Sequence, residues 1–184
     1  MKYNSITDIY TANEKIRHRL TSLLGSITDE EAAALPSGEK WAIVQIVEHL
    51  SMVSIGTSRI CSRLLEGARA SGKTSDGSFA LSENLGERAL EVAGIKIEAP
   101  ERVQPTGKVS LGDSIQHLSA ASHAMDALRD DLERLDVSEH KFPHPAFGDL
   151  TAAEWLVMAG LHEQRHTNQI ERILDKVRQE KAPG

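Results

Sequence analysis

The sequence contains little cysteine and few aromatic residues. Of its 184 residues only Cys61 is a cysteine, and 4% are aromatic. A single cysteine excludes an intrachain disulfide, so the sequence predicts a protein of the reducing cytoplasm. Cys61 itself is interpreted as a core residue rather than a nucleophile. A core poor in aromatic rings must be filled by aliphatic side chains, which favours packed helices over a β-sandwich.

Long apolar segments and basic clusters are also missing. No segment approaches the roughly 18 apolar residues of a membrane span, and residues 1–10 are too polar for a signal peptide. The net charge is −6 and no Lys/Arg run is present, which argues against a polyphosphate partner. We therefore expect no membrane and no nucleic acid as partner. The length suits one domain, predicted to span residues 1–184.

Apolar residues recur at helical spacing in four long segments. The predicted long helices are 6–25, 42–67, 113–135 and 151–178. The last of them begins with Thr151 and Glu154 at the spacing of a capping box. Thr28 and Glu31 have the same spacing and predict a short extra helix, and a further helix is predicted over 82–94.

Stretches rich in Gly, Pro and small polar residues separate these helices. They cover 69–78, 98–112 and 140–150. We expect the first stretch to be mobile and the other two to be irregular loops. Four long helices joined by long crossover loops predict an all-α four-helix bundle.

Two pairs of histidines have a spacing of four residues. His140 and His144 lie in the last loop, where Pro143 and Pro145 forbid a regular helix, so that their spacing places nothing on a common face. His162 and His166 lie deep in the last predicted helix, one turn apart on its apolar face. The second pair is therefore the candidate for function.

Two adjacent buried imidazoles need partners, because an unpaired buried polar group costs about 1–3 kcal/mol. One metal ion, bound about 2.0–2.1 Å from a nitrogen of each ring, would give both imidazoles a partner. The alternative is a pair of core histidines, bonded to Glu and backbone groups of other helices. The spacing of His162 and His166 leaves both interpretations open.

Two familiar metal patterns fail on closer inspection. Residues 162–166 read HEQRH and match the zinc-protease pattern, which requires a further ligand downstream. The later glutamates, Glu171 and Glu180, lie on the same helix and cannot fold back onto the site. Glu163 and His166 form one E-x-x-H unit, but a di-iron site needs a second copy, which the sequence lacks.

A third ligand must then come from another helix, and His49 is the candidate. It lies between Ile46 and Val53, at the edge of the apolar stripe of the second long helix. A lone histidine at such a position is usually structural, so the position alone does not assign it to a metal.

Three segments, taken in order and with their spacing, form a recognisable pattern. Residues 41–50 read WAIVQIVEHL, residues 148–155 read GDLTAAEW, and residues 162–170 read HEQRHTNQI. Pro105, Ser110 and the predicted helix from Asp113 lie between them. Over essentially the whole chain this arrangement resembles the DinB-like (DinB/YfiT) superfamily.

The resemblance implies a bundle in up-down-down-up order, whose long crossover joins the second and third core helices. It also implies one divalent metal ion, zinc or nickel, held by His49 from the second helix and by His162 and His166 from the last. A homodimer formed through helix faces would be in keeping with the family.

Relatives in the family include thiol-dependent S-transferases and a thiol-dependent isomerase. The resemblance therefore implies a metal-dependent enzyme that transfers a low-molecular-weight thiol to an electrophilic small molecule, with a thiolate or water on the metal as the reacting group. Two alternatives stay open. One is a non-catalytic metal-binding or stress-response protein, and the other is a metal-assisted hydrolase of a small ester or amide.

Three charged residues next to the candidate ligands have two interpretations each. Glu48 and Glu163 can orient an imidazole N–H, but neighbouring helix positions differ by about 100°, which favours a direction away from the metal. Arg165 can bind a substrate carboxylate, although a solvated surface position is the simpler expectation.

Overall fold

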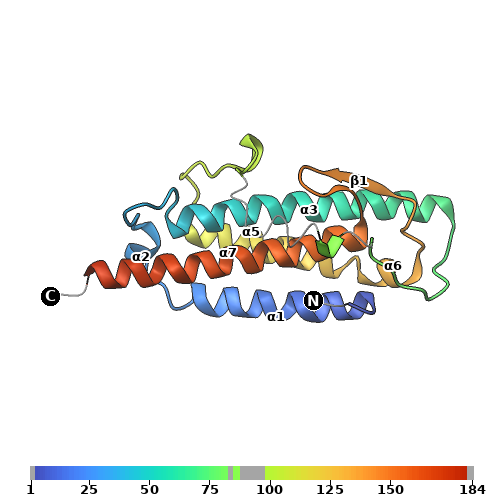
Figure 1. Ribbon diagram of the computed structural model, residues 1–184, viewed down its shortest axis with the longest axis horizontal. Helices are drawn as coiled ribbons and strands as arrows, with labels where there is room; N and C mark the ends of the chain where they lie inside the picture. Colours follow the sequence, from blue (N-terminus) through green and yellow to red (C-terminus); the bar gives the residue numbers. More distant parts are fainter. Residues whose placement is uncertain (1–2, 83–84, 88–97, 182–184) are drawn as a thin grey trace.

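The computed structural model describes residues 3–82, 85–87 and 98–181. Its long helices are α1 (Ile6–Leu24), α3 (Ile43–Ser71), α5 (Leu111–Asp126) and α7 (Ala152–Lys181). The short elements are α2 (Asp29–Ala33), the 3-10 helix η1 (Glu101–Val103), α6 (Arg129–Arg134), β1 (Lys141–His144) and β2 (Gly148–Thr151). In Figure 1, α1 and α7 run in one direction and α3 and α5 in the other. This four-helix bundle has the predicted up-down-down-up order.

The predicted helix caps are present. The Thr28 hydroxyl accepts from the Glu31 amide, and the Glu31 carboxylate accepts from the Thr28 amide, which completes the capping box of α2. Thr151 and Glu154 make the same reciprocal pair at the start of α7. Each cap satisfies amides that a helix leaves without a partner in its first turn.

Helix α3 continues beyond its predicted end at Gly67 and terminates at Ser71. The turn that ends it is at Gly72, whose φ of 67° suits a residue without a side chain. Gly67 has a different role, because a Cβ at that position would lie 2.7 Å from Nδ1 of His140. It lets the His140 ring pack directly against the helix.

The predicted helix 113–135 is broken into α5 and α6. Its apolar spacing is continuous, but α5 ends at Asp126 and α6 begins at Arg129. At the break, the carbonyl of Met125 accepts from the hydroxyl of Tyr10 at 2.7 Å and from the Leu128 amide at 3.0 Å. A contact with another helix has replaced the regular helical hydrogen bond.

The stretch 140–150, predicted to be irregular, forms a β-hairpin. Strands β1 and β2 pair antiparallel, with Lys141 opposite Thr151 and His144 opposite Gly148. The prediction of an irregular loop is wrong because Pro143 does not prevent this pairing. A two-stranded hairpin consists of edge strands, where a residue without an N–H is tolerated.

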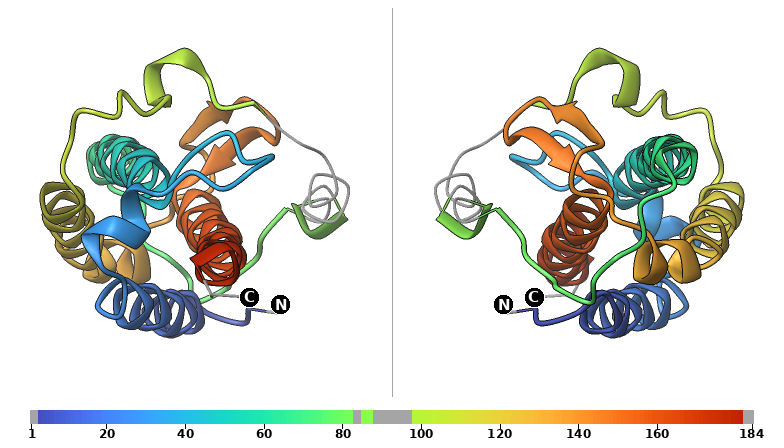
Figure 2. Two further views of the ribbon diagram at one scale, coloured as in Figure 1. Left: turned by 90° about the vertical axis from the view of Figure 1, so that its left-hand side faces the viewer. Right: turned by 90° about the vertical axis from the view of Figure 1, so that its right-hand side faces the viewer.

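The crossover between α3 and α5 is held at both of its described ends. Residues 73–75, predicted to be mobile, pair with the chain after α6 through an isolated bridge between Thr74 and Leu135. Seen from the end of the bundle, residues 98–110 arch over α3 on their way to α5 (Figure 2). Most of the predicted helix 82–94 lies outside the described residues, although residues 85–87 are helical.

The bundle core consists of two apolar clusters, one toward each end. One contains Ile9, Leu65 and Leu156 and extends to the hairpin, and the other contains Leu20 and Ile173 together with residues near α2. Between them lies a layer of polar side chains, which we call the polar layer. It consists of Arg17, His49, His162, Glu163 and His166.

No helix among the described residues is long and apolar enough to cross a lipid bilayer.

Candidate metal centre

The structure brings together the three histidines singled out in the sequence. His49 reaches the centre of the bundle from α3, and His162 and His166 reach it from α7. One ring nitrogen of each lies within 4.8 Å of the other two. The Nε2 atoms of His49 and His162 are 3.2 Å apart, and the ring centroids of His162 and His166 are 4.5 Å apart.

Hydrogen bonds on the far side of two rings settle which nitrogen faces the cluster. Nδ1 of His49 lies 2.7 Å from the carbonyl oxygen of Val103, which can only accept, so Nδ1 carries the hydrogen. Nδ1 of His166 lies 2.8 Å from Oε1 of Gln169 in the same manner. In both rings the lone pair is therefore on Nε2, on the side of the cluster.

This arrangement suits a metal ion held by imidazoles. Ligand nitrogens at about 2.0–2.1 Å from a tetrahedral ion are about 3.4 Å from one another. The observed 3.2 Å between the Nε2 atoms of His49 and His162 is close to that separation. Partners on Nδ1 that fix ring orientation are also typical of histidines that bind metals.

Burial favours the neutral form of all three imidazoles, of which that of His49 is buried and those of His162 and His166 are half-buried. His49 is only 4% exposed. Burial is the main reason why the pKa of each of the three histidines is lowered. At His162 and His166 the neighbouring imidazoles lower the pKa further. The pKa of His166 falls to about 4, and that of His162 lies well below its ordinary value. Protons therefore compete weakly with a metal ion at neutral pH.

The two acids beside the ligands point away from the cluster, as expected. Glu163 forms a two-pronged ion pair with Arg17 of α1. Glu48 turns toward the crossover, where its carboxylate accepts from Thr106 and Gly107. Burial alone would raise the pKa of Glu48, but these hydrogen bonds outweigh it and hold the pKa below its usual range.

Several other residues considered in the sequence lie outside the cluster. Cys61 is fully buried, and burial raises the pKa of its thiol to about 12, as suits a core residue. Arg165 is exposed on α7. His144 packs against Trp155 and Phe147 at the hairpin, with ring centroids 5.0 and 4.9 Å away.

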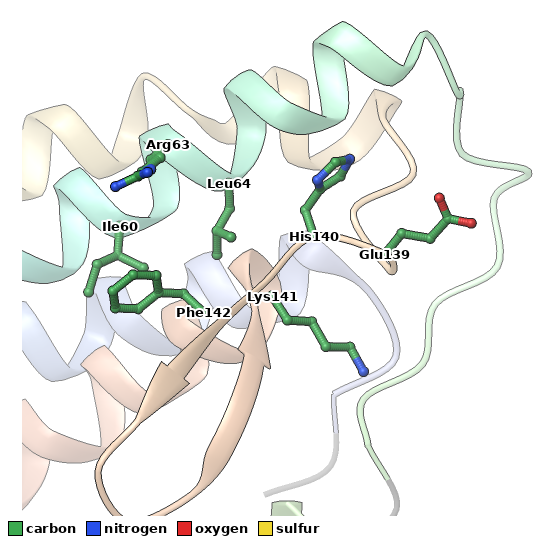
Figure 3. A pocket seen from close by; sticks show the side chains of 7 residues that line it. All are labelled: Ile60, Arg63, Leu64, Glu139, His140, Lys141 and Phe142. Atoms are coloured by element: carbon green, nitrogen blue, oxygen red, sulfur yellow. The ribbon is translucent and has the colours of Figure 1, made fainter.

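A cavity of about 380 Å³ opens between α3 and the chain entering β1 (Figure 3). Its lining residues are Ile60, Arg63, Leu64, Glu139, His140, Lys141 and Phe142. None of the three clustered histidines lines it, so this cavity is separate from the candidate metal centre.

The sequence did not reveal the partners that orient the ligands. Gln169 lies three residues after His166, and this helical spacing could have indicated the contact. No comparable signal exists for Val103, because a backbone carbonyl from a distant loop leaves no trace in residue type. Trp41, whose ring centroid lies 5.2 Å from that of His49, was noticed only as part of a motif.

Comparisons with known proteins agree with this architecture. The sequence pattern of the DinB superfamily matches residues 12–170. The protein YuaE of Bacillus subtilis (strain 168), which is described as uncharacterized, is 26% identical over 158 residues, which covers 84% of this chain and 90% of YuaE. The crystal structure of TT2238, a four-helix bundle protein, matches with a TM-score of 0.62 at 20% identity, covering 91% of this chain and 99% of that one.

Proposed function

The chain belongs to the DinB superfamily, and we propose that it is a metal-dependent enzyme that transfers a low-molecular-weight thiol to an electrophilic small molecule. The observation that carries the proposal is the convergence of His49, His162 and His166, whose ligand nitrogens lie within 4.8 Å of one another in the polar layer. Zinc or nickel is the expected ion.

The chemical character of the donors supports an ion with reactive capacity. The cluster consists of imidazoles, and the two acids next to the ligands in the sequence, Glu48 and Glu163, are bonded elsewhere. A donor set without a carboxylate leaves the ion its full positive charge. When bound, a divalent ion of this kind lowers the pKa of a coordinated thiol or water and polarises a carbonyl group.

The protein's own residues supply the orientation of the rings. Val103 and Gln169 hold two of the rings with Nε2 toward the cluster. The Trp41 ring contacts the His49 ring in a tilted arrangement, with the centroids 5.2 Å apart. With Nδ1 donating and Nε2 facing the cluster, the rings of His49 and His166 would have no lone pair left for a thiol proton once an ion was bound, so that proton would pass to solvent or substrate.

The first experiment measures metal per chain by mass spectrometry on untagged protein. We expect about one ion per chain in the wild type and in His117→Ala, which alters an exposed histidine of α5. We expect loss of the ion in His162→Ala. Failure of the wild type to bind zinc, nickel, manganese or iron after reconstitution would refute the metalloenzyme proposal.

The second experiment tests the dependence on thiol. The loaded protein is incubated with an aryl halide or epoxide and with bacillithiol, mycothiol, glutathione or cysteine in turn. Product formation that requires one thiol and disappears in His162→Ala supports the transferase. Hydrolysis of esters or amides without thiol would favour the hydrolase instead, and a loaded protein that turns over neither would favour a binding role.

A further inference from the structure

The carboxylate of Glu48 is buried, and none of its hydrogen-bond donors in the described part of the chain is charged. The side chain is 2% exposed and lies on α3 directly before His49. Its oxygens accept from the amide of Thr106 at 2.9 Å, from the Thr106 hydroxyl at 2.7 Å and from the amide of Gly107 at 2.9 Å. Burying an ionised carboxylate costs free energy. The three hydrogen bonds from Thr106 and Gly107 offset this cost.

The segment it binds is the one that orients His49. We call residues Glu101–Gly107 the strap. Its η1 turn ends at Val103, whose carbonyl accepts from Nδ1 of His49. Two consecutive residues of α3 thus bind the strap at two points. His49 binds it at Val103, and Glu48 binds it at Thr106 and Gly107.

The backbone of the strap is shaped for these two contacts. The Val103 amide donates to Pro100, and the Gln104 amide donates to Glu101, which forms the 3-10 turn and leaves the Val103 carbonyl free to face His49. Gly107 has a φ of 70°, a conformation that favours glycine, and its amide points at Glu48.

We infer that Glu48 is a positioning residue for the metal centre. It anchors the strap so that the Val103 carbonyl stays on Nδ1 of His49, which keeps the lone pair of Nε2 turned toward the cluster. This inference rests on the proposed function. Because coupling is reciprocal, an ion that fixes His49 must also stabilise the strap.

Glu154 provides a matched control for a purely structural role. Its carboxylate is 1% exposed and accepts from the amides and hydroxyls of Ser82 and Thr151. It therefore holds another connection of the bundle by the same chemistry, and its contacts do not include any of the three clustered histidines. Both Glu48→Gln and Glu154→Gln remove a buried carboxylate that holds a connection of the bundle. Only Glu48→Gln should also disturb the orientation of His49, so comparing the two variants separates the two effects.

The test is a competition titration of zinc against a chromophoric chelator. Outer partners of metal-binding histidines are typically worth about 10–100-fold in metal affinity, and we expect a loss of that size in Glu48→Gln. Glu154→Gln should lower the melting temperature but leave zinc affinity within about twofold of wild type. Thr106→Val removes the hydroxyl that donates to Glu48 and accepts from the Lys108 amide but keeps both backbone donors, and it gives a milder variant if Glu48→Gln does not fold.

Two further measurements report on the mechanism. Zinc should slow hydrogen exchange at the Thr106 and Gly107 amides in the wild type and less in Glu48→Gln. Imidazole ¹⁵N spectra of the metal-free protein should show His49 with its hydrogen on Nδ1, and a larger fraction on Nε2 in Glu48→Gln.

The outcomes separate this inference from the proposed function. If the wild type binds no metal, the proposed function fails, and the tautomer of His49 in the metal-free proteins still decides the role of Glu48. If Glu48→Gln keeps the wild-type tautomer, or binds zinc as tightly as Glu154→Gln does, the positioning role is wrong.

Discussion

Nδ1 of His49 lies 2.7 Å from the carbonyl oxygen of Val103, although the two residues are 54 positions apart in the chain. The candidate metal centre is thus completed by a loop rather than by the helices alone. Helices α3 and α7 supply the donor atoms, and the crossover that follows α3 decides which nitrogen of His49 faces them. Changes in that loop should therefore be felt at the site.

The first prediction concerns Gly107 and Gly72, which have φ values of 70° and 67°. Alanine at either position should cost about 1 kcal/mol of unfolding free energy, because a side chain disfavours this conformation. Only Gly107→Ala should also weaken zinc binding, since Gly107 donates to Glu48 while Gly72 ends α3. Urea unfolding and a zinc titration measure the two effects. Equal zinc affinity in both variants would contradict the role given to the strap.

The second prediction uses Trp41 as a reporter of metal binding. Its ring centroid lies 5.2 Å from that of His49, whereas Trp155 precedes His162 by seven residues, or roughly 10 Å along the helix. Nickel or cobalt should quench tryptophan emission in a saturable manner. The quenching should persist in Trp155→Phe and largely vanish in Trp41→Phe and His162→Ala. Quenching unchanged in Trp41→Phe would place the ion elsewhere.

The third prediction concerns the ion pair of Arg17 and Glu163 in the polar layer. Their side chains are 23% and 6% exposed, so Arg17→Met leaves a nearly buried carboxylate without its cation. We expect a loss of about 3 kcal/mol, seen as a melting temperature lower by roughly 6–12 °C. The double variant Arg17→Met/Glu163→Leu should regain most of this loss. A double variant as unstable as the single one would show that the carboxylate is not the source of the cost.

The fourth prediction is a dependence of stability on pH. Hydrogen bonds from Arg172 and then from Lys176 hold the pKa of Glu39 at about 2, below its ordinary value of 4.5. Since the folded state binds this proton less readily than the unfolded state, the contribution is complete above pH 4.5 and is lost as the pH falls toward 2.

Glu39→Gln should therefore lower stability by up to about 1 kcal/mol at pH 6, a size usual for ion pairs with exposed cations. The difference from wild type should shrink steadily in urea unfolding experiments between pH 4.5 and pH 3. A difference that stays constant over this interval would mean that the ion pairs contribute nothing to stability.

The long helices were predictable because each has an apolar stripe at helical spacing, and Thr151 adds a local start signal for the last of them. Helix α1 ends at Leu24, one residue before its predicted end, with Gly25 as its C-cap, and Thr28 and Thr151 cap their helices with the predicted partners. These signals lie within a few residues of one another, so no knowledge of the fold is needed to interpret them.

The errors occurred where a distant residue changes the local outcome. Gly67 was expected to end α3, but it accommodates the ring of His140. The break after Asp126 depends on the hydroxyl of Tyr10, which lies on another helix. Single-sequence patterns contain no information about such contacts.

The residues of the candidate site divide in the same way into those that a local pattern predicts and those that depend on distant contacts. His162 and His166 share a helix face because of their spacing alone, whereas His49 was placed with them only through a family resemblance. The anchoring of the strap by Glu48 joins residues 58 and 59 positions apart and could not be inferred from the sequence.

The polar layer also bears on how the helices are aligned along their length. Plain apolar stripes pack almost equally well when one helix slides by a turn, about 5.4 Å, past its neighbour. Such a slide of α7 would carry His162 away from His49 and Glu163 away from Arg17. The sliding would therefore leave a buried charge and buried imidazoles without partners, a penalty that apolar side chains cannot impose. The residues of the candidate metal centre thus help to select one alignment of the bundle among several that its apolar clusters alone would tolerate.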